Sequence, residues 1–321
     1  MSNKVVYFPY MSVPSSAWFT RSLLYWDSVA TIVPLEQFSN PAGLNEYTQD
    51  LLQAGLVEPI FPGQYTYRSN DFATAFIDLA NNSDDLGERQ EQFSKNSVVE
   101  IHAEKLSDVG LGLVDLKLAK TSDRDGWYLV EKITAEEFMC YLATFLGQLP
   151  DLDYVPITDQ IRSLNRLASF DSHMTPVQKN VNELRIQILE HALPSPRTAV
   201  SGRELMDFKE RYYGQLSRFR NEIEMELTLL ADINDVSLGQ RRLDLLRERI
   251  TIETEEIVHQ MKSHGWLDIG LGKLCPLLAL VPGVGYLPKV VSAVYKALAD
   301  VQPVNKRSPW AYAAFAQNLR Q

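Results

Sequence analysis

The sequence predicts an α/β or α+β domain at the N-terminus, with a βαβ start, followed by an all-α domain built on a long antiparallel helical hairpin. Short strand-like and helix-like patterns alternate in the first part of the chain, and apolar side chains keep a helical spacing in the later part. The pattern changes at Pro194 and Pro196. We therefore expect two domains, residues 1–195 and residues 196–321.

The βαβ unit is predicted from the first stretch of the chain. KVVYFPY is β-branched and aromatic and stops at Pro9, as a strand does. Ser15 and Ser16 supply an N-cap for a helix that carries Trp18, and SVATIVP reads as a second buried strand that ends at Pro34. Two strands joined by one helix are expected to be parallel, with a right-handed crossover.

The rest of the first domain mixes helices with strands. Helical spacing is found in NEYTQDLLQAGL and NDFATAFIDLA, and strand-like alternation in SVVEIHAEKL and WYLVEKI. TAEEFMCYLATFLGQL is expected to be a helix, with Thr134 as its N-cap and Glu137 completing a capping box. Residues 151–180 are polar and mixed, and no element is assigned to them.

Apolar residues follow one stripe through the second domain. The stripe contains Phe208, Tyr212, Leu216, Phe219, Ile223, Leu227 and Leu230, and after the loop ADINDVSLGQ it continues with Leu243, Leu246, Ile250, Ile257 and Met261. Two long helices joined by a short loop are expected to fold back on each other as the hairpin. Phe208, Tyr212, Phe219 and, further along, Tyr286 are candidate interaction residues, although the same stripe also suits a packed interior.

Composition narrows the class of protein. A hydrophobic content of 45% with 22% charged residues is typical of globular chains. The 31 Lys and Arg residues against 41 Asp and Glu residues give a net charge of -10, which disfavours nucleic acid as a ligand. Cys140 and Cys275 are too few for a disulfide framework, and the first residues do not read as a signal peptide, so a cytoplasmic location is expected.

An apolar segment near the C-terminus raises the question of a membrane. The segment LCPLLALVPGVGYLPK follows Lys273 and ends at Lys289. It is shorter than the roughly 20 residues that a membrane-spanning helix needs. Its three prolines also divide it into short turns. We expect it to pack over the helical hairpin; the alternative is an effector that acts on a membrane through residues 270–299.

The sequence EIHAE is the sharpest candidate for a reactive site. On a strand, Glu100, His102 and Glu104 would share one face, where two carboxylates and an imidazole can carry out acid-base chemistry or hold a divalent metal. A half-exposed strand with a polar outer face would show the same alternation. Tyr10 and Glu36 are expected at the carboxyl ends of the parallel strands, where ligands bind in α/β sheets.

Other motifs are too incomplete to indicate a cofactor. Glu256 and His259 have the E-x-x-H spacing of di-iron bundles, but no second copy of the motif is present. GLGL lacks the third glycine of a dinucleotide fingerprint, and GLGK lacks the hydroxyl residue of a phosphate loop. We therefore expect no cofactor, and whether a metal binds stays open.

Two stretches of the sequence carry a family signature. One is YFPYMSVPSSAWFTRSLLYWDSVATIVP, from Tyr7 to Pro34, and the other is FKERYYGQLSRFRNEIE, from Phe208 to Glu224. Both resemble a family of uncharacterised bacterial proteins, a domain of unknown function. The resemblance implies the strand-helix-strand start and the helical second half, it implies no reaction, and it points to genes of mobile elements and phage defence.

The expected function is a protein-interaction or sensing component in the cytoplasm, within a bacterial anti-phage system, whose helical half docks another protein or a second copy. An enzyme with its site at Glu100, His102 and Glu104 is the alternative, and a membrane effector is the third.

Overall fold

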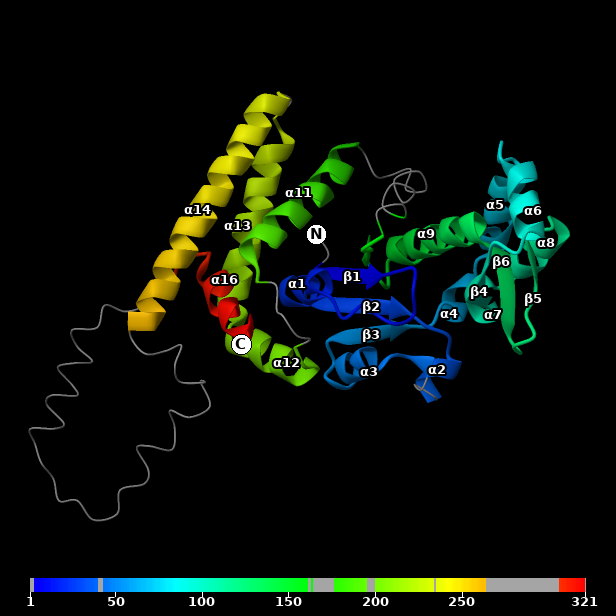
Figure 1. Ribbon diagram of the computed structural model, residues 1–321, viewed down its shortest axis with the longest axis horizontal. Coiled ribbons are helices and arrows are strands. Elements are labelled where there is room, and N and C mark those ends of the chain that lie inside the picture. The colour runs from blue at the N-terminus through cyan, green and yellow to red at the C-terminus, as the bar shows by residue number, and fades with distance from the viewer. Residues whose placement is uncertain are drawn as a thin grey trace, which may run out of the picture. The chain divides into compact units, whose positions relative to one another are not determined.

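The computed structural model describes residues 3–39, 43–160, 163, 176–194, 200–233, 235–263 and 306–320. It has an α/β region with a parallel sheet and many helices, in agreement with the predicted fold class in outline (Figure 1). The chain divides into two compact units. The first unit contains Met1–Lys179 and Ala199–Phe208, and the second contains Asn180–Thr198 and Lys209–Gln321.

The boundary between the units differs from a single cut near residue 195. The segment Ala199–Phe208 belongs to the first unit although it follows part of the second in sequence. The backbone N–H of Gly202 donates a hydrogen bond to Oδ2 of Asp50 at 2.6 Å, which ties the start of helix α12 (Gly202–Arg211) to the first unit. A contact between residues so far apart in sequence is invisible to a local pattern.

A four-stranded parallel sheet forms one part of the first unit. Its strands, in order across the sheet, are β3 (Val57–Ile60), β2 (Ser28–Ile32), β1 (Lys4–Tyr7) and β7 (Val155–Ile157). Strands β1 and β2 are parallel, with Val5 opposite Val29, so the predicted βαβ start is confirmed. Helix α1 (Ala17–Tyr25) joins them, and the Ser16 side chain caps it by accepting a hydrogen bond from the N–H of Phe19 at 3.2 Å.

The two edge strands of this sheet were not predicted from the sequence. Strand β3 contains Pro59, and strand β7 contains Pro156 and lies within the stretch to which no element was assigned. Proline lacks the N–H that a central strand uses to bond both neighbours, so prolines in strands are confined to sheet edges. Pro59 and Pro156 weaken the strand pattern in the sequence, and they also explain why β3 and β7 lie at the edges of the sheet.

The first unit also contains an antiparallel sheet. Its order is β4 (Val98–His102), β6 (Trp127–Glu131) and β5 (Ala119–Thr121). Strand β4 ends earlier than SVVEIHAEKL suggested, because residues Ala103–Leu106 form helix α7. The Nδ1 atom of His102 accepts a hydrogen bond from the N–H of Glu104 at 3.2 Å, so His102 caps this helix and terminates the strand.

Helix α9 (Lys132–Gln148) starts before the predicted position. Its N-cap is Glu131, whose carboxylate accepts hydrogen bonds from the N–H groups of Ile133 at 2.9 Å and Thr134 at 2.7 Å. The expected capping box of Thr134 and Glu137 is therefore wrong. Glu137 instead forms a two-pronged ion pair with the guanidinium of Arg89, with Nη2 and Oε1 2.9 Å apart.

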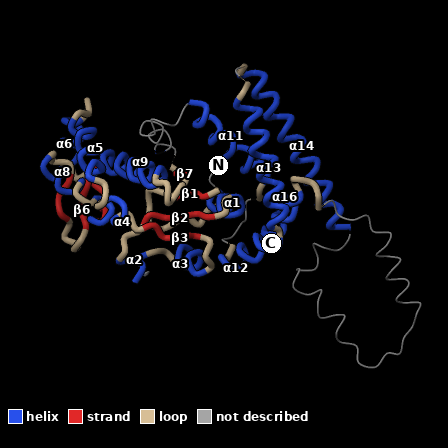
Figure 2. The backbone as a smooth tube through the Cα atoms, turned by 180° about the vertical axis from the view of Figure 1, so that it is seen from behind, coloured by secondary structure: helices blue, strands red, loops and turns tan. Residues whose placement is uncertain are grey.

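One continuous core joins the two sheets of the first unit. Val6 and Phe8 from the β1 region, Ile101 of β4, and Phe138 and Leu142 of α9 belong to the same buried cluster. The remaining helices of this unit are α2 (Glu36–Ser39), α3 (Glu46–Gln53), α4 (Gly63–Thr66), α5 (Asn70–Asn81), α6 (Leu86–Ser94) and α8 (Val109–Asp115). Figure 2 shows α9 running between the parallel and antiparallel sheets.

The second unit is helical where it is described. Its elements are α13 (Tyr213–Ala231), α14 (Val236–Ser263), α16 (Ala311–Ala316) and the 3-10 helix η2 (Gln317–Arg320). Most of α11 (Pro176–Ala192) and the end of α12 also fall in it. Much of the predicted apolar stripe is buried, including Leu216, Phe219, Ile223, Leu227, Leu243, Leu246 and Ile250. Asp235 marks the start of α14, since its carboxylate accepts a hydrogen bond from the N–H of Ser237 at 2.8 Å.

The C-terminal apolar segment lies outside the described residues, and so do Tyr286, Cys275 and the proposed membrane-acting stretch 270–299. Among the helices that the structure does describe, none combines the length and the apolar character that a bilayer crossing needs.

Candidate functional site

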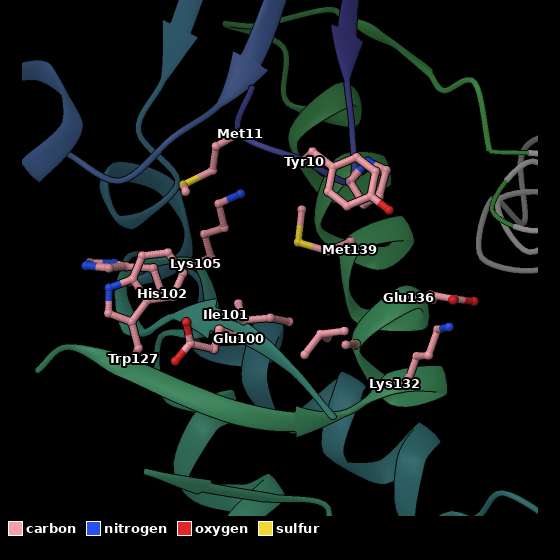
Figure 3. A pocket seen from close by; sticks show the side chains of 13 residues that line it. Tyr10, Met11, Glu100, Ile101, His102, Lys105, Trp127, Lys132, Glu136 and Met139 are labelled. Carbon is pink, nitrogen blue, oxygen red and sulfur yellow. The ribbon is translucent and has the colours of Figure 1, made fainter. Parts of the chain in front are cut away.

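A cavity of about 200 Å³ lies in the first unit, where the loop after β1 faces β4, β6 and α9 (Figure 3). Its lining residues are Pro9, Tyr10, Met11, Val99, Glu100, Ile101, His102, Lys105, Trp127, Lys132, Ala135, Glu136 and Met139. We call it the Lys105 cavity. Apolar side chains form much of its wall, with a few polar groups between them, which is the usual composition of a small-molecule site.

The loop after β1 brings the cavity to the carboxyl edge of the parallel sheet. Strand β1 ends at Tyr7, and Tyr10 and Met11 follow it into the cavity wall. The hydroxyl of Thr31 in β2 donates a hydrogen bond to the carbonyl oxygen of Met11 at 2.9 Å and so holds the loop in place. Tyr10 therefore lies at the sheet edge where the sequence led us to expect ligand contacts.

His102 is fixed by contacts to both of its ring nitrogens. Nδ1 accepts the hydrogen bond from Glu104 N–H, which assigns the proton to Nε2, and Nε2 lies 3.3 Å from Oε2 of Glu36. The ring also meets Trp127 edge-on, with centroids 5.2 Å apart. His102 is buried and these contacts fix its ring, so the imidazole forms a rigid part of the cavity wall.

Glu100, His102 and Glu104 do not share one face. Glu100 lines the cavity and accepts a hydrogen bond from the hydroxyl of Ser122 at 2.7 Å. Glu104 lies on α7 beyond the end of the strand, and its Oε2 accepts a hydrogen bond from the N–H of Leu35 at 2.7 Å. The turn into α7 thus separates Glu104 from the other two, and in the described ranges no group of three His, Cys, Asp or Glu side chains is placed to hold a metal ion.

Lys105 is the residue that the sequence reading missed. It is only 4% exposed, and burial lowers the pKa of its amine from 10.5 to about 7. It lines the cavity, and no residue in the described part of the chain gives it a hydrogen bond or an ion pair. In the sequence, Lys105 stands among charged residues, a pattern typical of an exposed segment. Helix α7, which begins at Ala103, determines the direction of its side chain.

The opposite wall of the cavity comes from α9. Lys132, Glu136 and Met139 line the cavity from successive turns of that helix. Figure 3 shows the Met139 side chain directed toward Lys105 and His102, whereas the charged ends of Lys132 and Glu136 point away from them. Lys132 is exposed, in contrast to Lys105. The cavity therefore carries two lysines in different environments, one at its solvent side and one inside.

The predicted interaction residues pack against other side chains of the chain where they are described, and Tyr212 is half-buried. Phe208 and Phe219 are buried, and the ring of Phe219 packs against Trp310 and Tyr312 at centroid distances of 5.8 and 5.6 Å. Tyr212 stacks on Phe315 at 4.7 Å. Their apolar surface is used within the chain, so they do not offer a free docking face. Glu256 and His259 belong to no metal cluster in the described residues.

Comparison with known proteins returned no match among protein-family models, curated protein sequences or solved structures. The resemblance to an uncharacterised bacterial family therefore stays a prediction.

Proposed function

We propose that the first unit is a sensing component that binds a small, mainly apolar molecule carrying one oxygen acceptor group. The observation that supports the proposal is the buried amine of Lys105 at the wall of the Lys105 cavity, without a partner among the described residues. The Lys105 nitrogen is not among the fully enclosed unpaired side-chain atoms of the described residues, so the amine is accessible from the cavity. A ligand oxygen in the cavity would give this amine a hydrogen-bond partner that no described residue supplies.

The cavity wall defines the rest of the ligand. Met11, Ile101 and Met139 supply apolar surface, and thioethers adapt to ligands of different shape. Trp127 adds an aromatic face to the cavity wall. The guanidinium of Arg124 lies 4.0 Å from the centroid of this ring. A single planar ring with one carboxylate or carbonyl group suits a space of about 200 Å³. Benzoate is therefore a suitable probe.

Calorimetric titration with benzoate tests the proposal. Because the pKa of Lys105 is about 7, the amine is mostly neutral one to two pH units above that value. A bound carboxylate would favour the ammonium form, so binding there should take up close to one proton, visible as an enthalpy that depends on the buffer. Lys105→Met should abolish both binding and proton uptake, while Lys120→Met, which changes an exposed lysine outside the cavity, should keep them.

Two results would count against this site. One is the absence of any heat or chemical-shift change at the cavity residues with benzoate at millimolar concentration. The other is binding that survives Lys105→Met unchanged, since the ligand would then lie elsewhere.

A second proposal concerns self-association of the helical unit. We propose that α13 and α14 form the expected antiparallel hairpin, and that a second copy of the chain docks on α14. The pairing of Arg242 with Glu226 and of Arg249 with Glu222 supports the hairpin, because later residues of α14 meet earlier residues of α13.

Three apolar side chains support the docking of a second copy. Leu238, Leu245 and Ile252 are 55%, 58% and 57% exposed, and their seven-residue spacing keeps them on one side of α14. Exposed Arg241 lies in the first half of the helix and exposed Glu255 in the second, so two copies running in opposite directions would bring unlike charges together.

Light scattering after size-exclusion chromatography tests this second proposal. The chain should form a dimer, and Leu245→Lys should convert it to a monomer without a change in helical content. A wild-type chain that is monomeric at every concentration tried would end the proposal. A role in phage defence stays a prediction that rests on the resemblance.

A further inference from the structure

We propose that Lys105 forms a covalent imine with the carbonyl group of a small aromatic aldehyde bound in the Lys105 cavity. The inference rests on the binding function proposed above and adds the chemical class of the ligand. Its basis is the placement of a buried primary amine, free of any hydrogen bond within the described part of the chain, at the wall of a cavity of about 200 Å³.

A lysine amine attacks a carbonyl carbon only in its neutral form. Burial lowers the pKa of Lys105 to about 7, so about half of this amine is neutral at pH 7. An ordinary lysine with a pKa near 10.4 has only about one neutral amine in a few thousand at that pH. The difference in the neutral fraction is about a thousandfold.

Among the described residues, no carboxylate around Lys105 offsets the lowering of its pKa by burial. The charged or titratable groups that line the cavity are Glu100 and His102 from β4, Lys132 and Glu136 from α9, and Tyr10 from the loop after β1. None of them forms an ion pair with Lys105 among the described residues. Glu104, the nearest carboxylate in sequence, is occupied by the N–H of Leu35. No described carboxylate therefore restores the ammonium form.

The reaction balances without an oxidant or a further cofactor. The nitrogen lone pair of Lys105 forms a C–N bond to the aldehyde carbon while the C=O π bond breaks, and the oxygen takes up a proton to give a carbinolamine. The nitrogen then loses a proton, the protonated hydroxyl leaves as water, and a C=N bond forms. The net change is aldehyde plus amine to imine plus water.

Benzaldehyde with cyanoborohydride tests the inference on the whole 321-residue chain. Cyanoborohydride supplies the hydride that reduces the imine to a stable benzyl amine, and peptide mapping by mass spectrometry locates the benzyl group. At pH 7, Lys105 should be labelled at least ~10-fold faster than Lys132, since its neutral fraction is far larger. Benzoate should slow the labelling of Lys105 alone.

The outcomes separate the two proposals. If benzoate binds in a manner that depends on Lys105 but benzaldehyde does not label Lys105 faster than Lys132, the imine inference is wrong and the binding function stands. If neither probe acts at Lys105, both are wrong. Mapping of the wild-type protein decides the question even if Lys105→Met fails to fold.

Discussion

The imidazole Nε2 atom of His102 lies 3.3 Å from the carboxylate Oε2 atom of Glu36, which stands 66 residues away in the chain. The contact links the start of α2, after the second parallel strand, to the end of β4 in the antiparallel sheet. His102 also caps α7 through its other nitrogen. One side chain therefore fixes both a contact between the sheets and the turn that points Lys105 into the cavity.

The capping role of His102 predicts a difference between two substitutions. His102→Ala and His102→Asn both remove the ring that packs on Trp127 and the contact to Glu36. Asparagine can still accept the hydrogen bond from Glu104 N–H, as a good N-cap does, whereas alanine cannot. His102→Asn should be more stable than His102→Ala by about 1 kcal/mol, measured by urea denaturation. Equal stability would show that the cap contributes nothing.

The lowered pKa of Lys105 predicts how the stability of the protein depends on pH. Between pH 7 and 10.5 the unfolded chain holds a proton on Lys105 that the folded chain lacks, so stability rises with pH across this window. Below the window both states are protonated and the cost of the buried ammonium is fully present. Lys105→Met removes that cost, so the variant should gain most at pH 6, by up to about 5 kcal/mol, and almost nothing near pH 10.5.

Lys132→Met is the matched control for the pH experiment. Lys132 lines the same cavity but is exposed, so its substitution should shift the stability curve by a nearly constant, small amount. The other titrating groups of the cavity are present in the wild type and in both variants, so their effects largely cancel in the differences. A gain for Lys105→Met that did not fall between pH 7 and 10.5 would contradict the burial of a neutral amine.

The ion pair of Arg89 and Glu137 predicts a large loss on removal of one partner. The side chains are 6% and 14% exposed, so Glu137→Met leaves a guanidinium largely buried. Among the described residues, its remaining ion-pair partner is Asp85, 2.7 Å away. Loss of one partner of a buried pair costs about 3–5 kcal/mol. The double variant Arg89→Met with Glu137→Met should recover much of that loss in urea denaturation. A double variant less stable than Glu137→Met would show that the pair is not the cause.

Local chemistry accounts for the parts of the fold that the sequence predicted. The β1–α1–β2 start was predicted from Pro9, from the Ser16 cap and from apolar runs. These signals lie close together in sequence, and the elements they define also pack together. The start of α9 shows the limit of such reasoning. Thr134 and Glu137 satisfy the capping pattern, yet Glu131 at the end of β6 caps the same helix earlier and leaves Glu137 for Arg89.

The candidate site was predictable only in part for the same reason. Glu100 and His102 share a strand and a cavity, but Ile101, which period-two alternation places on the opposite face, lines the cavity as well. Tyr10 lies at the expected edge of the sheet. Lys105 faces a cavity whose other walls come from the β1 loop and from α9, which are distant from it in sequence. The residues next to Lys105 in the sequence therefore do not indicate that its side chain is buried.

The close approach of α9 to β7 predicts opposite effects for two glycine substitutions. A Cβ atom at Gly147 would lie 2.5 Å from the carbonyl oxygen of Tyr154 and 3.3 Å from Cδ of Pro156, so Gly147→Ala must push the end of α9 away from the edge strand. We expect a loss of about 1–3 kcal/mol, as for other overpacked sites. At Gly87 in α6 nothing lies within 4 Å of the added atom, and Gly87→Ala should stabilise the helix by up to about 1 kcal/mol. Urea denaturation followed by circular dichroism compares the two, and a Gly147→Ala protein as stable as the wild type would mean that α9 and β7 do not pack at this distance.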